Sequence, residues 1–338
     1  MESIGIAVLG AGRIGRLHAE NAAHRIPGVA LKAVCDVRLD AARALAGELG
    51  AALACEDPDE AIGRDDVDAV LVCSSTDTHA DLIERAARAG KHVFCEKPIA
   101  LDLEVIDRAL ETVASAGVTL QVGFNRRFDP SFRRLHDLVR GGALGAPHML
   151  RISSRDPEPP PLDYVKVSGG LFLDMAIHDF DMARFQMGCE AEEIFATGAA
   201  LVDPAVGELG DIDTAVICLR FANGALGCID NSRRAVYGYD QRVEVFGSKG
   251  MAAAGNRKPD SVELSDAEAV RGAKPLYFFT ERYAESYLEE LRAFVQAVRD
   301  GAPSPVTGLD GRMPVVMGLA ARRSLEQGRP VRLEEIEY

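Results

Sequence analysis

The chain has 338 residues, of which 47% are hydrophobic and 27% charged, a balance typical of a globular enzyme with two domains. Its net charge of −14 argues against nucleic acid and anionic membrane surfaces as partners, because both need a basic footprint. No apolar run is long enough to span a membrane, and the first residues do not resemble a signal peptide. The seven cysteines form no Cys-x-x-Cys pair, which favours reduced thiols in a cytoplasmic protein over a zinc site.

The first part of the chain alternates apolar strand candidates with amphipathic helix candidates. Strands are expected at 4–9, 30–35, 69–73, 92–95 and 119–122, and helices at 13–24, 39–49, 79–89 and 102–116. The strands are continuous runs of Val, Leu, Ile and Ala, so both faces of their sheet should be covered. We therefore expect an α/β domain, residues 1–122, with a doubly wound parallel sheet.

The pattern changes after Gly123, where prolines mark a loop and longer strand candidates follow. A helix is expected at about 173–187, strands at 191–201, 212–221, 225–234 and 241–247, and closing helices at 281–299 and 310–327. The residues Ala222-Asn223-Gly224-Ala225 predict a two-residue hairpin between two of these strands. We expect a second, α+β domain, residues 123–338, with a large open sheet that is mainly antiparallel.

A glycine-rich turn follows the first strand directly and precedes the first helix. In this G-x-G-x-x-G pattern, Gly10 permits the tight turn, Gly12 lets the backbone approach a pyrophosphate, and Gly15 allows close helix–strand packing. The free N–H groups at the start of the helix then meet the phosphates. The expected phosphate-binding residues are Gly10, Gly12, Arg13, Ile14 and Gly15.

Further cofactor contacts are expected where the next strands end. A carboxylate at Asp36 accepts hydrogen bonds from the adenosine ribose and repels a 2′-phosphate, whereas Arg38 favours that phosphate. NAD is therefore the expected cofactor, and NADP stays open. Ser74, Ser75 and His79 follow the strand at 69–73, at the edge where such sheets bind ligands, although His79 serves equally well as a packing residue.

Two motifs far apart in the chain carry the expected chemistry. Lys97 follows the strand at 92–95 and can stabilise a developing oxyanion, while Glu96 neutralises it or contacts the nicotinamide ribose. Asp174 and His178 are spaced i, i+4 and would share one face of the expected helix, where the carboxylate orients the imidazole as a general base. The alternatives are a solvated acidic helix start and a metal site of Asp174, His178 and a third ligand.

These motifs, together with residues 121–128 (Gln-Val-Gly-Phe-Asn-Arg-Arg-Phe), resemble the Gfo/Idh/MocA oxidoreductases over nearly the whole chain. Residues 154–157, 174–184 and 237–242 are similar to the inositol dehydrogenases of that family. The resemblance implies a Rossmann domain and a second domain whose open sheet often builds a homotetramer.

The resemblance also implies a reaction and a set of site residues. It assigns His178 as acid/base, Lys97 as the residue that binds the reacting hydroxyl, and Asp174 as a substrate-binding or polarising group. It further places Arg127, Asp156 and Tyr237 near the substrate. The implied reaction is the NAD-dependent oxidation of a cyclic polyol, myo-inositol to its 2-ketone. The alternatives are scyllo-inositol or an aldopyranose of the glucose or galactose type as substrate, and a nucleotide-sensing protein without catalysis.

Overall fold

The computed structural model describes residues 3–336, which form two compact units. The first unit runs to Asn125 and takes in Glu285–Met313, and the second comprises Arg126–Ala284 and the chain from Pro314 onward. The passage between them near Asn125 lies close to the expected boundary at 122/123. Residues 285–313 differ from the expectation, since they belong to the first unit and not to the second.

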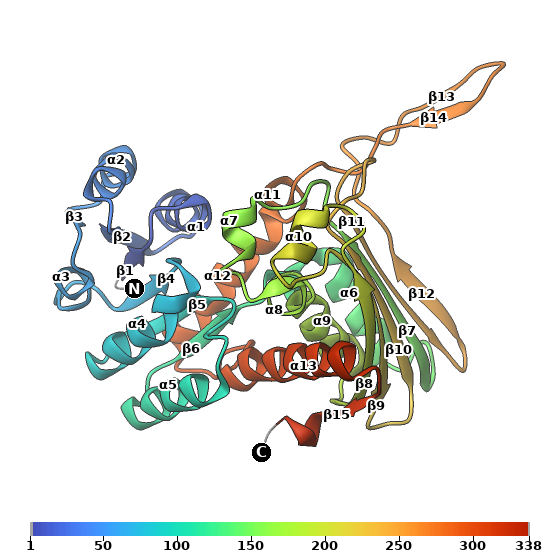
Figure 1. Ribbon diagram of the computed structural model, residues 1–338. Helices are drawn as coiled ribbons and strands as arrows, with labels where there is room; N and C mark the ends of the chain where they lie inside the picture. Colours follow the sequence, from blue (N-terminus) through green and yellow to red (C-terminus); the bar gives the residue numbers. More distant parts are fainter. Residues whose placement is uncertain (1–2, 337–338) are drawn as a thin grey trace. The chain divides into compact units, whose positions relative to one another are not determined.

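The first unit contains a parallel sheet with the strand order β3-β2-β1-β4-β5-β6 (Figure 1). Its strands are β1 (Ile4–Leu9), β2 (Val29–Cys35), β3 (Leu53–Cys55), β4 (Ala69–Val72), β5 (His92–Glu96) and β6 (Leu120–Gly123). Its helices are α1 (Arg13–His24), α2 (Leu39–Leu49), α3 (Pro58–Ile62), α4 (Thr76–Arg88), α5 (Leu103–Ala116) and α12 (Ala284–Asp300). The doubly wound parallel sheet expected from the sequence is confirmed; β3 and α3, which are short, are additions to it.

Helix α12 joins the first unit because it completes a hydrophobic core. Its residues Leu288, Leu291, Phe294 and Val295 lie in one buried cluster with alanines of α1 and α2 and with side chains of β1, β2, β4 and β5. Helices α4 and α5 lie over the opposite face of the sheet (Figure 1). Both faces are therefore covered, which explains why the strands carry continuous apolar runs.

The second unit contains a mixed sheet with the strand order β12-β11-β7-β10-β9-β8-β15. Its strands are β7 (Pro147–Arg155), β8 (Ala191–Ala199), β9 (Thr214–Phe221), β10 (Leu226–Ser232), β11 (Asp240–Gly247), β12 (Gly250–Ala254) and β15 (Val331–Arg332). The pairing is antiparallel except between β7 and β10. The large, mainly antiparallel sheet is confirmed, as is the hairpin at residues 222–225, which joins β9 to β10 and has Gly224 at a φ of 84°.

Helices cover one face of this second sheet. They are α6 (Pro130–Arg140), α8 (Gly170–Asp174), α9 (Ile177–Met187) and α13 (Gly308–Gln327), which belongs to this unit from Pro314 onward. The short α7 (Leu162–Val165), α10 (Pro204–Glu208) and α11 (Phe279–Arg282) lie beside them. The strands alternate buried and exposed residues, as expected for a sheet with one open face. A small hairpin, β13 (Glu263–Ser265) and β14 (Val270–Gly272), projects from this unit (Figure 1). Among the described residues, no helix is both long and apolar enough to cross a bilayer.

Candidate active site

The glycine turn after β1 is closed at two of its glycines and open at the third. Gly10 has a φ of 107°, and a Cβ atom there would lie 2.6 Å from the Cys73 carbonyl oxygen. A Cβ at Gly15 would lie 1.7 Å from the carbonyl oxygen of Gly10, so this part of the turn is closed. At Gly12, by contrast, no atom of the described residues beyond its neighbours along the chain comes within 4 Å of the Cβ position. The open space therefore lies at the start of α1, where backbone N–H groups meet a phosphate.

This contrast predicts opposite results for two alanine substitutions. Gly12→Ala should fold with a melting temperature near that of the wild type but raise the dissociation constant of NADH at least about tenfold, since the methyl group fills the phosphate space. Gly15→Ala should lose about 1–3 kcal/mol of stability, because its methyl group overlaps the Gly10 carbonyl. Thermal denaturation and titration of NADH fluorescence measure the two effects. Wild-type NADH affinity in Gly12→Ala would show that the space is not used by the cofactor.

Asp36, at the end of β2, lies directly beside this turn. Its carboxylate accepts hydrogen bonds from the backbone N–H of Ala11, at 2.7 Å, and of Arg38, at 2.8 Å. The side chain of Asp36 is only 10% exposed, whereas that of Arg38 is 72% exposed. A carboxylate that is hydrogen-bonded to the glycine turn therefore lies at the end of β2, where the sequence analysis expects the adenosine ribose of NAD to bind.

The loops that follow β4 and β5 lie next to the glycine turn, because β1, β4 and β5 are parallel neighbours. His79 is buried, and its ring nitrogens lie 2.8 Å from the Pro98 carbonyl and 3.1 Å from the Ser74 carbonyl. This bridge between the two loops favours the packing role for His79 over a ligand contact. Ser74 hydrogen-bonds to Thr78, and Ser75 directly precedes α4. The ends of β1, β4 and β5 therefore align the glycine turn, Ser74–Ser75 and Glu96–Lys97 along one edge.

In the second unit, Asp156 and Asp174, both predicted to bind substrate, form ion pairs with one arginine, Arg233, that the sequence analysis missed. The Arg233 guanidinium follows β10 and is 5% exposed; its Nη2 lies 2.9 Å from Asp174 Oδ2 and its Nη1 3.6 Å from Asp156 Oδ2. The Tyr164 hydroxyl donates to the other carboxylate oxygen of Asp174, at 2.9 Å. Nothing in the spacing of Arg233 distinguishes it from a solvated surface arginine, so only the fold identifies it.

The charges of this cluster influence one another. Burial raises the pKa of the Asp156 carboxyl to about 6; Arg233 opposes the shift, and the negative charge of Asp174 adds to it. Burial, followed by the charge of Asp174, also raises the pKa of the Tyr164 hydroxyl, which keeps it a hydrogen-bond donor. The cluster thus offers a cation, two carboxylates and a phenol, groups that suit a ligand rich in hydroxyls.

The helix expected at 173–187 is interrupted, which corrects the predicted relation between Asp174 and His178. Helix α8 ends at Asp174 and α9 begins at Ile177, so the two residues belong to different helices. The break follows from the backbone, because the N–H groups of both Met175 and Ala176 bond to the carbonyl of Leu171 and close the last turn of α8. His178 then lies in the first turn of α9 and is partly accessible between two buried neighbours.

Arg127 forms a buried ion pair in the second unit. It holds Asp181 with its Nε and Nη2 atoms, at distances of 2.6–3.0 Å. The neighbouring Arg126 lies 2.6 Å from Asp179, whose second oxygen accepts from Asn231 at 2.8 Å. Asp179 and Asp181, to which the sequence analysis gave no role, are therefore the fully buried partners of these arginines.

Tyr237 belongs to another network. Its hydroxyl donates to Asp240 at 2.6 Å and accepts from Arg155 at 3.1 Å, and the residue is 38% exposed. Within the same segment, residues 237–242, Tyr239 is buried. Its hydroxyl oxygen lies 3.5 Å from Nη2 of Arg126. Substrate contacts by Arg127 and Tyr237 stay predictions.

Comparison with known proteins identifies the family. Residues 4–124 match the model described as the oxidoreductase family with an NAD-binding Rossmann fold, and residues 132–253 match the GFO/IDH/MocA C-terminal domain. The chain is 56% identical to myo-inositol 2-dehydrogenase of Thermotoga maritima, covering 98% of this chain and 99% of the relative. It is 46% identical to inositol 2-dehydrogenase of Rhizobium meliloti, over 97% of this chain and 99% of that one.

A solved structure extends the comparison to bound ligands. Scyllo-inositol dehydrogenase of Lactobacillus casei, with bound NAD(H) and scyllo-inositol, superposes with a TM-score of 0.92 at 32% identity, covering 98% of this chain and 100% of that one. The glycine turn, the doubly wound first sheet and the mixed second sheet agree with these matches. The chain belongs to the Gfo/Idh/MocA family and is an oxidoreductase with an NAD-binding Rossmann domain.

Proposed function

We propose that the protein oxidises myo-inositol at C2 to the corresponding ketone, with NAD⁺ as the cofactor. The observation that carries the proposal is the Asp156–Arg233–Asp174 cluster, in which one buried guanidinium holds two carboxylates. Oriented carboxylates accept hydrogen bonds from hydroxyls, and a substrate made of hydroxyls would be costly to bury without such acceptors. The relative named a myo-inositol 2-dehydrogenase at 56% identity supports the choice of epimer.

The proposed roles of the residues follow from their chemistry. His178 removes the proton of the reacting hydroxyl, and Lys97 stabilises the negative charge that develops on its oxygen. Asp174 binds the substrate beside the histidine, while Asp156 receives further hydroxyls. NAD⁺, when bound, supplies the acceptor for the hydride that leaves the same carbon. The carboxylate of Asp36 favours NAD⁺ over NADP⁺, because it repels a 2′-phosphate.

An absorbance assay for NADH tests the proposed function. Purified protein is mixed with NAD⁺ and, in separate reactions, myo-inositol, scyllo-inositol, D-glucose or D-galactose, and the series is repeated with NADP⁺. We expect the highest kcat/KM with myo-inositol and NAD⁺. A higher value with scyllo-inositol or a sugar would reassign the substrate. NADH binding without turnover of any of them would favour the nucleotide-sensing alternative.

The expected homotetramer is part of the proposal. The outward face of the second sheet exposes large apolar side chains, namely Phe195, Val216, Leu226, Phe246 and Met251, which are 37–52% exposed. A patch of this kind suits contact with a second copy of the chain. The cytoplasmic location expected from the unpaired cysteines stays a prediction.

A further inference from the structure

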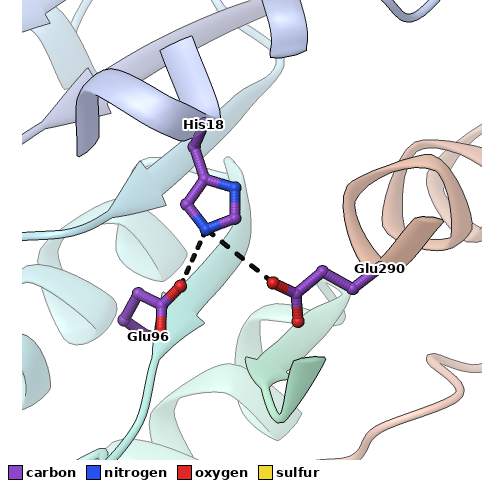
Figure 2. Close-up of side chains that lie close together, drawn as sticks. All are labelled: His18, Glu96 and Glu290. Atoms are coloured by element: carbon purple, nitrogen blue, oxygen red, sulfur yellow. Dashed lines mark hydrogen bonds and ion pairs between the residues drawn. The ribbon is translucent and has the colours of Figure 1, made fainter. Parts of the chain in front are cut away.

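A second buried cluster lies in the first unit, at the carboxyl end of β5. Figure 2 shows His18 of α1, Glu96 of β5 and Glu290 of α12 pointing toward one another. His18 Nε2 lies 2.7 Å from Glu96 Oε1 and 3.9 Å from Glu290 Oε1. His18 and Glu290 are fully buried, whereas the side chain of Glu96 is 13% exposed. Glu96 is therefore the member of the cluster that a ligand can reach.

The surroundings hold His18 and Glu290 in place. The His18 ring makes edge contacts with Phe94, at 4.9 Å between centroids, and with Tyr287, at 5.8 Å. The backbone carbonyl of Glu290 accepts a hydrogen bond from Gln121 at 2.8 Å. These contacts hold the imidazole, and its hydrogen bond to Glu96 in turn orients that carboxylate.

Glu290 is the neutral acid of the cluster. Both of its carboxyl oxygens are buried without a hydrogen-bond partner among the described residues, an arrangement that an ionised carboxylate would not tolerate. Burial, followed by the negative charge of Glu96, raises the pKa of Glu290 well above its usual value. The thiols of Cys73 and Cys95 also face the cluster, and burial raises their pKa values too, so they add no charge. The hydrogen bond between His18 and Glu96 is therefore the main polar interaction within the cluster.

We propose that His18 is a positioning residue for Glu96, with the neutral acid Glu290 beside the imidazole, and that the bond between His18 and Glu96 fixes the turn carrying Glu96 and Lys97 so that the dinucleotide binds tightly. The inference rests on the proposed placing of Glu96 at the cofactor. Helix α1 begins at the glycine turn and carries His18 one turn further on, so the cluster joins the phosphate-binding helix to the end of β5. The 2.7 Å contact is a hydrogen-bond distance, shorter than the roughly 3.3 Å between two ligands of one tetrahedral zinc ion.

The first test removes the bond between His18 and Glu96. His18→Phe keeps an aromatic ring between Phe94 and Tyr287. We expect it to raise the dissociation constant of NADH about tenfold, the effect of losing one charged hydrogen bond. His18→Gln, which retains a donor, should recover most of the affinity. His24→Phe, at an exposed position at the end of the same helix, is the matched control and should bind NADH like the wild type. Wild-type affinity in His18→Phe would overturn the proposal.

The second test concerns the proton on Glu290 and needs only a folded protein. Glu290→Gln matches the shape of the neutral acid and should bind NADH within about twofold of the wild type at pH 7. Because folding raises the pKa of Glu290, its contribution to the stability of the wild type is lost as the pH rises above about 4.3, the ordinary glutamate value, and the glutamine variant lacks this loss. The melting temperature of Glu290→Gln should therefore exceed that of the wild type by a margin that widens by several degrees between pH 5 and pH 8.

Glu289→Gln is the matched control for this test, since its side chain lies next along α12 and is 42% exposed. Its melting temperature should differ from that of the wild type by the same amount at every pH. If the difference between Glu290→Gln and the wild type were also independent of pH, Glu290 would not be a neutral acid in the folded protein. Stabilisation of the wild type but not of Glu290→Gln by added Zn²⁺ would overturn the proposal in favour of a cation site. The dissociation constant of NADH and the melting temperature are measured without inositol. A protein that failed to oxidise inositol would therefore count against the proposed function and not against this inference.

Discussion

His178→Ala is expected to lower kcat by about 10²- to 10⁴-fold, the usual contribution of a general base. The imidazole takes the hydroxyl proton in the proposed reaction, and a methyl group cannot. Helix α9 should survive the change, because Ile177, Phe180 and Met182 beside it are fully buried and anchor it. The initial rate of NADH formation at saturating NAD⁺ and inositol measures the effect.

The control for this variant is His148→Ala, at an exposed position on β7. It should leave kcat unchanged. In both variants the dissociation constant of NADH should stay near the wild-type value, because the glycine turn that we expect to hold the phosphates belongs to the first unit. Wild-type turnover in His178→Ala would remove this residue from the mechanism.

Arg233→Ala is expected to cost about 3–5 kcal/mol of folding stability and to abolish measurable inositol binding. The large cost arises because the substitution leaves two carboxylates, Asp156 and Asp174, without the cation that holds them. Arg233 opposes the rise in the pKa of Asp156, so its removal should raise that pKa further above about 6. A carboxyl whose pKa is raised by folding favours the folded state at low pH, and this stabilisation is lost as the pH rises. The stability deficit should therefore be larger at pH 8 than at pH 5.

Chemical denaturation at the two pH values measures the deficit, and calorimetry measures inositol binding. Arg233→Lys keeps the positive charge but loses the planar guanidinium, which can bond two carboxylates at once. It should therefore recover part of the stability but little of the inositol binding. Arg234→Ala, at the exposed neighbouring position, should match the wild type in both measurements. A deficit below about 1 kcal/mol in Arg233→Ala would show that the two carboxylates do not depend on the arginine.

Much of the first unit was predictable because its signals are local. Continuous apolar runs predicted the strands, and the helices expected at 39–49 and 102–116 end directly before left-handed glycines, Gly50 and Gly117. The glycine turn and Asp36 lie within one β-α-β segment, so their spacing along the chain already defines their geometry. In the second unit, strand β7 carried an alternating pattern that could have been recognised, since Leu150, Ile152 and Ser154 face inward.

The sequence by itself determined the fold class, the hairpin at Gly224 and the NAD-binding domain, since each depends on neighbours along the chain. Only the tertiary structure decided the partners of the buried charges. Arg233 is 59 residues from Asp174 along the chain, and Glu290 is far from both His18 and Glu96, yet packing brings each group together. The same packing assigned residues 285–313 to the first unit, because the apolar face of α12 completes its core. Pairing over such separations follows from which surfaces bury one another, and no spacing in the sequence encodes it.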